Sequence, residues 1–122
     1  MHACVRRQLR DRWLDYHVYL SKTKDNGQWT MDNIATLIQR RENPKDIWYH
    51  LYEFPCEEKQ TEDAYPFTHV LSHQKIHARF LVRKVQKMPE IPGTIVIRWD
   101  DLNDYALSRL TLRALDTLPR KA

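Results

Sequence analysis

The segment from Phe67 to Val85 constrains the fold more than any other part of the chain, because apolar and polar residues alternate along it. A period of two places successive side chains on opposite faces of a β-strand. One face carries Ile76, Ala78, Phe80 and Val82, and the other carries His73, Lys75, His77, Arg79 and Arg83. We therefore predict a long strand with one face in the core and one cationic face.

Strands are also predicted earlier in the chain. Aromatic and β-branched residues favour a strand at Trp13 to Ser21, preceded by a basic, polar linker at Arg6 to Arg12. The turn sequence Asp25-Asn26-Gly27 separates that strand from an apolar run at Ile34 to Gln39. This order predicts a hairpin with a long loop. The polar, acidic stretch from Glu57 to Tyr65 lacks periodicity and predicts a loop.

The last third of the chain predicts a strand followed by a helix. Pro89 and Pro92-Gly93 interrupt the chain before a strand at Thr94 to Arg98. Ser108 then caps an amphipathic helix, whose apolar positions are Leu110, Ala114 and Leu118. Strands with a terminal helix packed on them indicate an α+β fold.

Length and composition limit the function classes. A chain of 122 residues fits one domain. Its formal net charge of +4 and pI near 9.2 favour an acidic partner such as a phosphate backbone. With Gly27 and Gly93 as its two glycines, the sequence has no phosphate-binding glycine loop.

Cysteine content and hydropathy indicate the compartment. Cys4 and Cys56 are too few for a disulfide framework or a four-thiolate metal site, which indicates reduced thiols in the cell interior. No stretch approaches the roughly 20 apolar residues of a membrane span. We expect a cytoplasmic protein with no membrane contact.

Two catalytic interpretations are weak. On a strand, the four-residue spacing of His69, His73 and His77 spreads the rings over roughly 27 Å at about 3.4 Å per residue, so no metal site is expected. Ser72 beside a histidine lacks an orienting acid and an oxyanion glycine, so nucleophilic catalysis is not expected either.

The aromatic run before Pro55 is expected to be structural. Trp48, Leu51, Tyr52 and Phe54 have the residue types of a core. The adjacent cations Arg40, Arg41 and Lys45 are either a solvated rim or phosphate contacts.

Four stretches together resemble the C-terminal domain of adenine DNA glycosylases of the MutY type, over roughly Arg12 to Leu118. Arg12-Trp13-Leu14-Asp15-Tyr16 resembles the basic-aromatic first strand of that domain. Gln39-Arg40-Arg41, Asp46-Ile47-Trp48 and Leu51-Tyr52-Glu53-Phe54-Pro55 resemble its arginine, tryptophan and "EFP" signature. His69-Val70-Leu71-Ser72-His73 resembles its H-x-F-S-H loop, and Tyr105-Ala106-Leu107-Ser108-Arg109-Leu110 resembles its Y-A-x-P-R-L.

The resemblance implies a Nudix-like fold without Nudix hydrolase activity: a mixed or antiparallel sheet with a C-terminal helix packed on it. Residues 1–11 would be a linker or lead-in, and residues 12–122 the domain that recognises 8-oxoguanine. The chain departs from the pattern at Leu71, where Phe is usual, and at Ser108, where Pro is usual. Its segment from Glu57 to Pro66 is short for the helix often found there, so the Nudix-type helix is expected to be reduced or absent.

The same resemblance implies a role in base excision repair. The chain would not itself be an enzyme, and the parent protein would hydrolyse the N-glycosidic bond of adenine mispaired with 8-oxoguanine. The partners implied are double-stranded DNA of the bacterial nucleoid and an N-terminal catalytic glycosylase domain of the same parent. No cofactor is expected in this chain, whereas an iron-sulfur cluster is expected in that catalytic domain.

The resemblance assigns the DNA and 8-oxoguanine contacts to His69, Leu71, Ser72 and His73. Ser72 would contact the oxidised base edge, Leu71 would wedge between base pairs, and the two histidines, held protonated by the polyanion, would donate to phosphate or base. Possible phosphate contacts are Arg40, Arg41, Lys45, Lys75, His77 and Arg79. Two alternatives stay open: a Nudix-like hydrolase of oxidised nucleotides, and a protein-interaction module.

Overall fold

The computed structural model describes residues 9–24, 26–46 and 48–118. The elements in chain order are β1 (Arg10–Lys22), η1 (Met31–Asn33), β2 (Ile34–Arg40), β3 (Tyr52–Glu53), β4 (Cys56–Lys59), β5 (Phe67–Val70), β6 (Gln74–Lys84), β7 (Thr94–Arg98), η2 (Trp99–Asp104) and α1 (Arg109–Leu115). The two η elements are short 3-10 helices.

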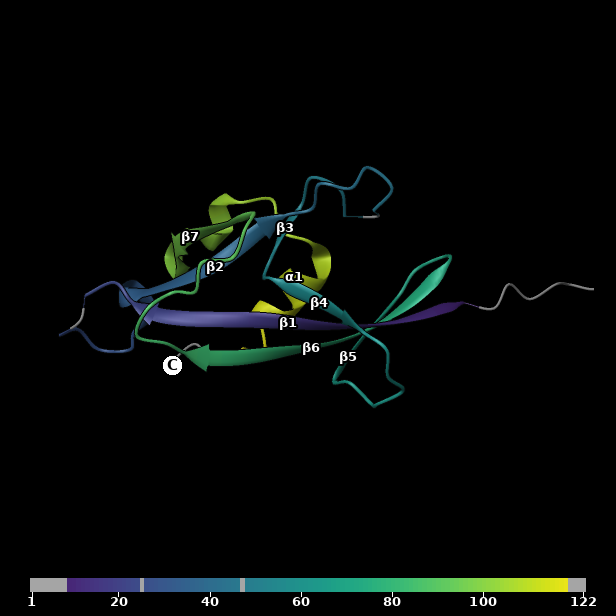
Figure 1. Cartoon of the computed structure of the whole chain (residues 1–122), viewed down its shortest axis with the longest axis horizontal. Helices are drawn as coiled ribbons and strands as arrows, with labels where there is room; N and C mark the ends of the chain where they lie inside the picture. The colour runs from purple at the N-terminus through teal and green to yellow at the C-terminus, as the bar shows by residue number, and fades with distance from the viewer. Residues whose placement is uncertain (1–8, 25, 47, 119–122) are drawn as a thin grey trace, which may run out of the picture.

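Two long parallel strands, β1 and β6, run along the length of the molecule (Figure 1). Their register extends from Arg10 beside Gln74 to Leu20 beside Lys84. β5 pairs antiparallel with β6, and β4 pairs antiparallel with β1. β2 pairs antiparallel with the end of β1, with β3 and with β7. The described strands therefore form one mixed sheet with the path β3-β2-β1-β6-β5.

The core lies on the apolar face of β1 and β6 that the alternation predicted. Tyr16 of β1 and Ile76 and Ala78 of β6 are fully buried. Leu110 and Ala114 of α1 are buried with them, so the helix packs on this core. Burying side chains of this size stabilises the fold by about 1.5 to 3 kcal/mol each.

Ser108 caps α1, as predicted. Its Oγ accepts a hydrogen bond from the backbone N–H of Thr111 at 3.2 Å, and its own backbone N–H donates to the carbonyl oxygen of Tyr52 at 2.9 Å. A proline here would lose both bonds, because it has neither the hydroxyl nor the N–H. The helix ends at Leu115, so the prediction that it includes Leu118 is wrong, although Leu118 still packs against the core.

The hairpin of β1 and β2 and the strand at Thr94–Arg98 are confirmed. The single long strand is wrong, because the chain reverses after Val70 and forms the hairpin β5–β6. The loop from Glu57 is wrong in its first three residues, which pair with β1 as part of β4. The linker boundary is also wrong, since β1 begins at Arg10, and residues 6–8 of that linker lie outside the described residues.

None of the helices in the described ranges has the length and apolarity that crossing a membrane requires.

Candidate nucleic-acid interface

The turn that joins β5 to β6 projects from the end of the sheet beside the start of β1 (Figure 1). The backbone N–H of Leu71 donates to the carbonyl oxygen of Gln74 at 2.8 Å and closes the turn. The N–H of Arg10 donates to the carbonyl oxygen of His73 at 3.2 Å and ties the turn to β1. We call Leu71, Ser72 and His73 the hairpin tip.

The hairpin tip exposes Ser72 and His73. Among the described residues, the Ser72 hydroxyl has no hydrogen-bond partner. Exposure alternates along the preceding strand: Val70 is 61% exposed, whereas His69 and Leu71 are half-buried. Leu71, predicted as the wedge, packs against the core because it lies on the inner side of the hairpin. Val70, which we did not predict, is the exposed apolar side chain.

His69 lies between the hairpin and α1. Nη1 of Arg113 donates to the carbonyl oxygen of Thr68 at 3.0 Å and lies 3.4 Å from Nδ1 of His69. Arginine has no acceptor, so Nδ1 must accept and the ring proton must sit on Nε2. Burial, with the charges of Arg113 and Arg109, lowers the pKa of His69. Both effects work against the protonated His69 that we expected to donate to DNA, and the contact with Arg113 favours the tautomer with its proton on Nε2.

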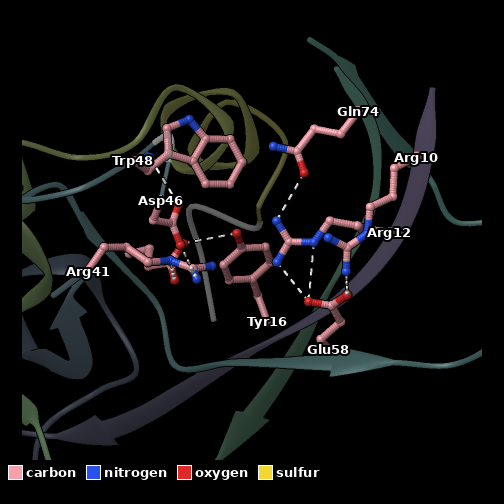
Figure 2. Close-up of polar contacts among 9 residues, drawn as sticks. Arg10, Arg12, Tyr16, Arg41, Asp46, Trp48, Glu58 and Gln74 are labelled. Carbon is pink, nitrogen blue, oxygen red and sulfur yellow. Dashed lines mark hydrogen bonds and ion pairs between the residues drawn. The ribbon is translucent and has the colours of Figure 1, made fainter. Parts of the chain in front are cut away.

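A second set of contacts holds the base of the hairpin (Figure 2). Arg12 donates from Nη2 and Nε to Oε1 of Glu58, at 2.7 and 3.2 Å, and from Nη1 to Oε1 of Gln74 at 3.0 Å. Gln74 directly follows the hairpin tip. Arg12 thus joins β1, β4 and β6 immediately beneath the exposed residues.

Arg41, predicted as a possible phosphate contact, is instead held inside the fold (Figure 2). Its guanidinium pairs with Glu53 at 2.5 Å and with Asp46 at 3.0 Å, and its side chain is 19% exposed. Tyr16 donates from its hydroxyl to the other carboxylate oxygen of Glu53 at 3.0 Å. Because a buried carboxylate needs a charged partner, Arg41 serves the core and not the surface.

The contacts of Asp46 also position Trp48. Asp46 accepts a bond from the Trp48 backbone N–H at 3.0 Å, and the buried Trp48 ring lies 5.9 Å from the His69 ring. The aromatic run is therefore structural, as expected, and one of its members packs beside the hairpin.

The predicted cationic face of β6 is wrong at His77 and Arg79, because carboxylates of β1 lie beside them. Nε2 of His77 lies 2.9 Å from Asp11, and its ring stacks on Trp13 at 4.4 Å. Arg79 forms two bonds to the buried Asp15, at 2.8 and 3.0 Å. The cause is the parallel register of β1 and β6, which brings acidic residues of β1 next to basic residues of β6.

Other predicted cations are more accessible. Lys75 lies beside Val70 in the β5–β6 register and is half-buried, and Lys45 is exposed. Arg40 is exposed and pairs with Glu42 at 3.0 Å.

The sequence reasoning missed three arginines near the hairpin tip. Arg109 and Arg113 are exposed on α1 and close enough to affect the pKa of His69. Arg10, whose side chain is 75% exposed, lies beside Gln74. The four-residue spacing of Arg109 and Arg113 on a predicted helix was the available signal, since such residues share one face.

No group of three or more histidine, cysteine, aspartate or glutamate side chains in the described part of the chain has a geometry that could hold a metal ion. The hairpin places Ile76 opposite His69 and His77 opposite Thr68, so His69 and His77 point to opposite faces. Two of the three glutamates in the acidic stretch from Glu57 to Tyr65 lie on β4 and have protein partners: Glu57 pairs with Lys59 at 3.1 Å, and Glu58 with Arg12.

No family model and no curated protein matches the sequence. Solved structures with a similar fold include the C-terminal domain of mouse MUTYH, crystallised in complex with human PCNA, with a TM-score of 0.66 and 12% identity over 88% of this chain and 86% of that one. They also include RenU, a Nudix hydrolase from M. smegmatis, with a TM-score of 0.54 and 11% identity over 87% of each chain. The predicted α+β, Nudix-like fold is thereby confirmed.

Proposed function

We propose that this chain is the lesion-recognition domain of an adenine DNA glycosylase, and that it binds 8-oxoguanine in duplex DNA opposite adenine. The exposed Ser72 at the tip of a projecting hairpin is the observation that carries the proposal. The fold shared with the C-terminal domain of MUTYH supports it. The hydrolysis of the adenine N-glycosidic bond would belong to a separate catalytic domain of the parent protein, which would also hold the iron-sulfur cluster.

The chemistry of the lesion suits a hydroxyl at this position. Oxidation at carbon 8 turns the acceptor N7 of guanine into an N–H donor and adds an acceptor oxygen beside it. The Ser72 hydroxyl can accept from the new N–H, while backbone N–H groups of the hairpin tip can donate to the new oxygen. The hydroxyl can also rotate and donate to N7 of unmodified guanine, which limits its selectivity. We therefore expect this contact to favour 8-oxoguanine over guanine by about 1 to 3 kcal/mol.

The surroundings of Ser72 supply the remaining contacts. Val70 is an exposed apolar side chain that can enter between base pairs, a role we had assigned to Leu71. The cations at this end, Arg10, Arg109 and Arg113, suit the phosphates on either side of the lesion. His69, whose Nδ1 lies 3.4 Å from Nη1 of Arg113, can donate from Nε2. His73 is exposed within the tip itself.

The test is a comparison of Ser72→Ala with the unchanged domain, in the glycosylase that contains it. We expect the preference for 8-oxoguanine over guanine opposite adenine to fall about tenfold, since 1.4 kcal/mol is a factor of ten. Thr61→Ala, which removes a hydroxyl from the loop after β4, is the matched control. An unchanged preference in Ser72→Ala would reject the assignment.

A second measurement tests the alternative that the chain is a Nudix-like hydrolase. A Nudix-like hydrolase of oxidised nucleotides would release pyrophosphate from an oxidised deoxyguanosine triphosphate in the presence of magnesium. We expect no such release, because Glu57 and Glu58 lie on β4 in ion pairs with Lys59 and Arg12. Magnesium-dependent release that Glu57→Gln or Glu58→Gln abolished would replace the lesion-recognition proposal with the hydrolase.

A further inference from the structure

β1 and β6 both end on the side of the molecule away from the hairpin tip (Figure 1). A tryptophan and two lysines meet at these strand ends. The ammonium of Lys84, the last residue of β6, lies 5.0 Å from the centroid of the Trp29 ring. The ammonium of Lys22, the last residue of β1, lies 5.4 Å from the same ring. Both distances are those of cation–π contacts, so the indole draws two positive charges to one place.

A hollow of about 590 Å³ opens beside this ring. Its lining residues are Lys22, Trp29, Val85, Gln86 and Lys87. The volume lies within the range of sites that take small organic ligands. We call this hollow, together with Lys84 at its side, the Trp29 pocket.

The Trp29 pocket is strongly basic. Lys84 and Lys87 are exposed, and Lys22 is half-buried. No carboxylate of the described residues forms an ion pair with Lys84. An anion entering the pocket would therefore meet the ammonium of Lys84 without having to displace a carboxylate of the described residues from it.

We propose that the Trp29 pocket binds a nucleotide unit of nucleic acid, with its phosphate against Lys22 and Lys84 and its base against the face of Trp29. Single-strand binding sites combine these two features, an aromatic platform and a cationic groove. The amide of Gln86 adds a donor and an acceptor for a base edge.

The composition of the pocket favours a nucleotide over an acidic peptide. A carboxylate would use the ammonium groups but would leave the indole face unfilled. A base covers that face, and stacking of this kind strengthens binding by about tenfold or more per base. The two lysines that lie over the ring would then move to the phosphate.

This site is separate from the hairpin tip. Ten residue steps of β6 divide Gln74 from Lys84, which at about 3.3 Å per step is roughly 33 Å. A base held by Ser72 therefore lies far from Trp29. The two proposals can therefore be rejected independently. Binding at the Trp29 pocket requires no lesion, and the selectivity of Ser72 for 8-oxoguanine requires no contact at Trp29.

The experiment is a titration of the complete 122-residue chain followed by the indole N–H signal of Trp29 in ¹H–¹⁵N spectra. The probes are a ten-nucleotide thymidine strand, thymidine 5′-monophosphate, and a ten-residue glutamate peptide. We expect the strand to shift the Trp29 signal at salt-dependent micromolar to millimolar concentrations. Saturation by the mononucleotide alone would assign the pocket to free nucleotides, which have the same chemistry.

Lys84→Gln should weaken binding of the strand about fivefold and lower the salt slope by about 0.7, the loss of one single-strand phosphate contact. Trp29→Leu should weaken it about tenfold. Arg83→Gln is the matched control, because Arg83 precedes Lys84 on β6 and points to the opposite face. Arg83→Gln should change neither value appreciably.

Three results would overturn the proposal. The first is a strand titration that leaves the Trp29 signal unmoved, and the second is equal binding by Lys84→Gln and the unchanged chain. The third is tighter binding of the glutamate peptide than of the thymidine strand, which would assign the pocket to an acidic protein partner.

Discussion

Arg113 directs the ring of His69: its Nη1 lies 3.4 Å from Nδ1 of His69 and also donates to the carbonyl oxygen of Thr68. One side chain of α1 thus orients an imidazole on β5 and holds the strand that leads to the hairpin tip. The helix, which contributes its inner face to the core, contributes its outer face to the proposed interface.

Arg113→Gln should raise the pKa of His69 toward the ordinary value near 6.5, because burial and the arginine charges together lower it. A histidine-resolved NMR titration measures the change and reports the tautomer. Arg98→Gln, at an exposed arginine on β7, removes the same charge elsewhere and should leave the His69 titration unchanged. A midpoint unaffected by Arg113→Gln would show that burial alone sets it.

Leu71→Ser should lower the free energy of unfolding by about 1 to 2 kcal/mol, because Leu71 packs against the core. Val70→Ser should change it by less than about 0.5 kcal/mol, since the Val70 side chain lies in solvent. Urea denaturation of both variants measures the difference. Val70→Ser should instead weaken binding to DNA that contains the lesion, although it leaves the stability of the fold nearly unchanged. Equal destabilisation by both variants would contradict the inward position of Leu71.

Asp15→Asn should destabilise the fold, because it removes the negative charge that accepts two hydrogen bonds from the Arg79 guanidinium. In the unchanged chain, the hydrogen-bonded Arg79 lowers the pKa of Asp15 against the opposing effect of burial. A carboxyl with a lowered folded pKa contributes stability above its unfolded pKa, near 3.9, and loses it as the pH falls further. The urea concentration at the midpoint of unfolding, measured from pH 7 down to pH 3, should therefore decrease once the pH is below about 4. The decrease should be less steep in Asp15→Asn.

Cys56 should react slowly with thiol reagents in the folded chain. Burial, followed by the nearby Glu53 charge, raises the pKa of the Cys56 thiol to about 12, so at pH 8 almost none of it is the reactive thiolate. Alkylation of a Cys4→Ser variant by iodoacetamide, followed by mass spectrometry, isolates this thiol. Reaction should accelerate strongly in urea. Equal rates in folded and unfolded protein would show that Cys56 is open to solvent.

Local patterns predicted the parts of the fold that depend on neighbours in sequence. The alternation predicted the core face correctly at Ile76, Ala78 and Phe80 but wrongly at Val82, which is 40% exposed, and Ser108 predicted the start of α1. The alternation missed the reversal at Leu71-Ser72-His73, since those three residues include no Gly, Pro, Asn or Asp to indicate a turn, and only the family resemblance predicted a loop there.

The errors in the site come from long-range pairing. His77 and Arg79 look like free cations until parallel pairing places Asp11 and Asp15 beside them. Arg41 likewise looks like a rim residue until the buried Glu53 is known to face it. None of these three carboxylate partners can be found from spacing along the chain, because the register of the sheet brings each pair together.

The parallel pairing of β1 with β6 also determines when a newly made chain can acquire its binding surface. Asp15 and Arg79, adjacent in the sheet, are 64 residues apart in sequence. Closing so long a loop carries a large entropic cost before any contact repays it, and chains dominated by such contacts fold slowly. During synthesis, β1 can pair with β2 and β4 before the ribosome releases β6, but its longest pairing has to wait for β6. The bonds that tie the hairpin tip and Gln74 to Arg10 and Arg12 can form only then.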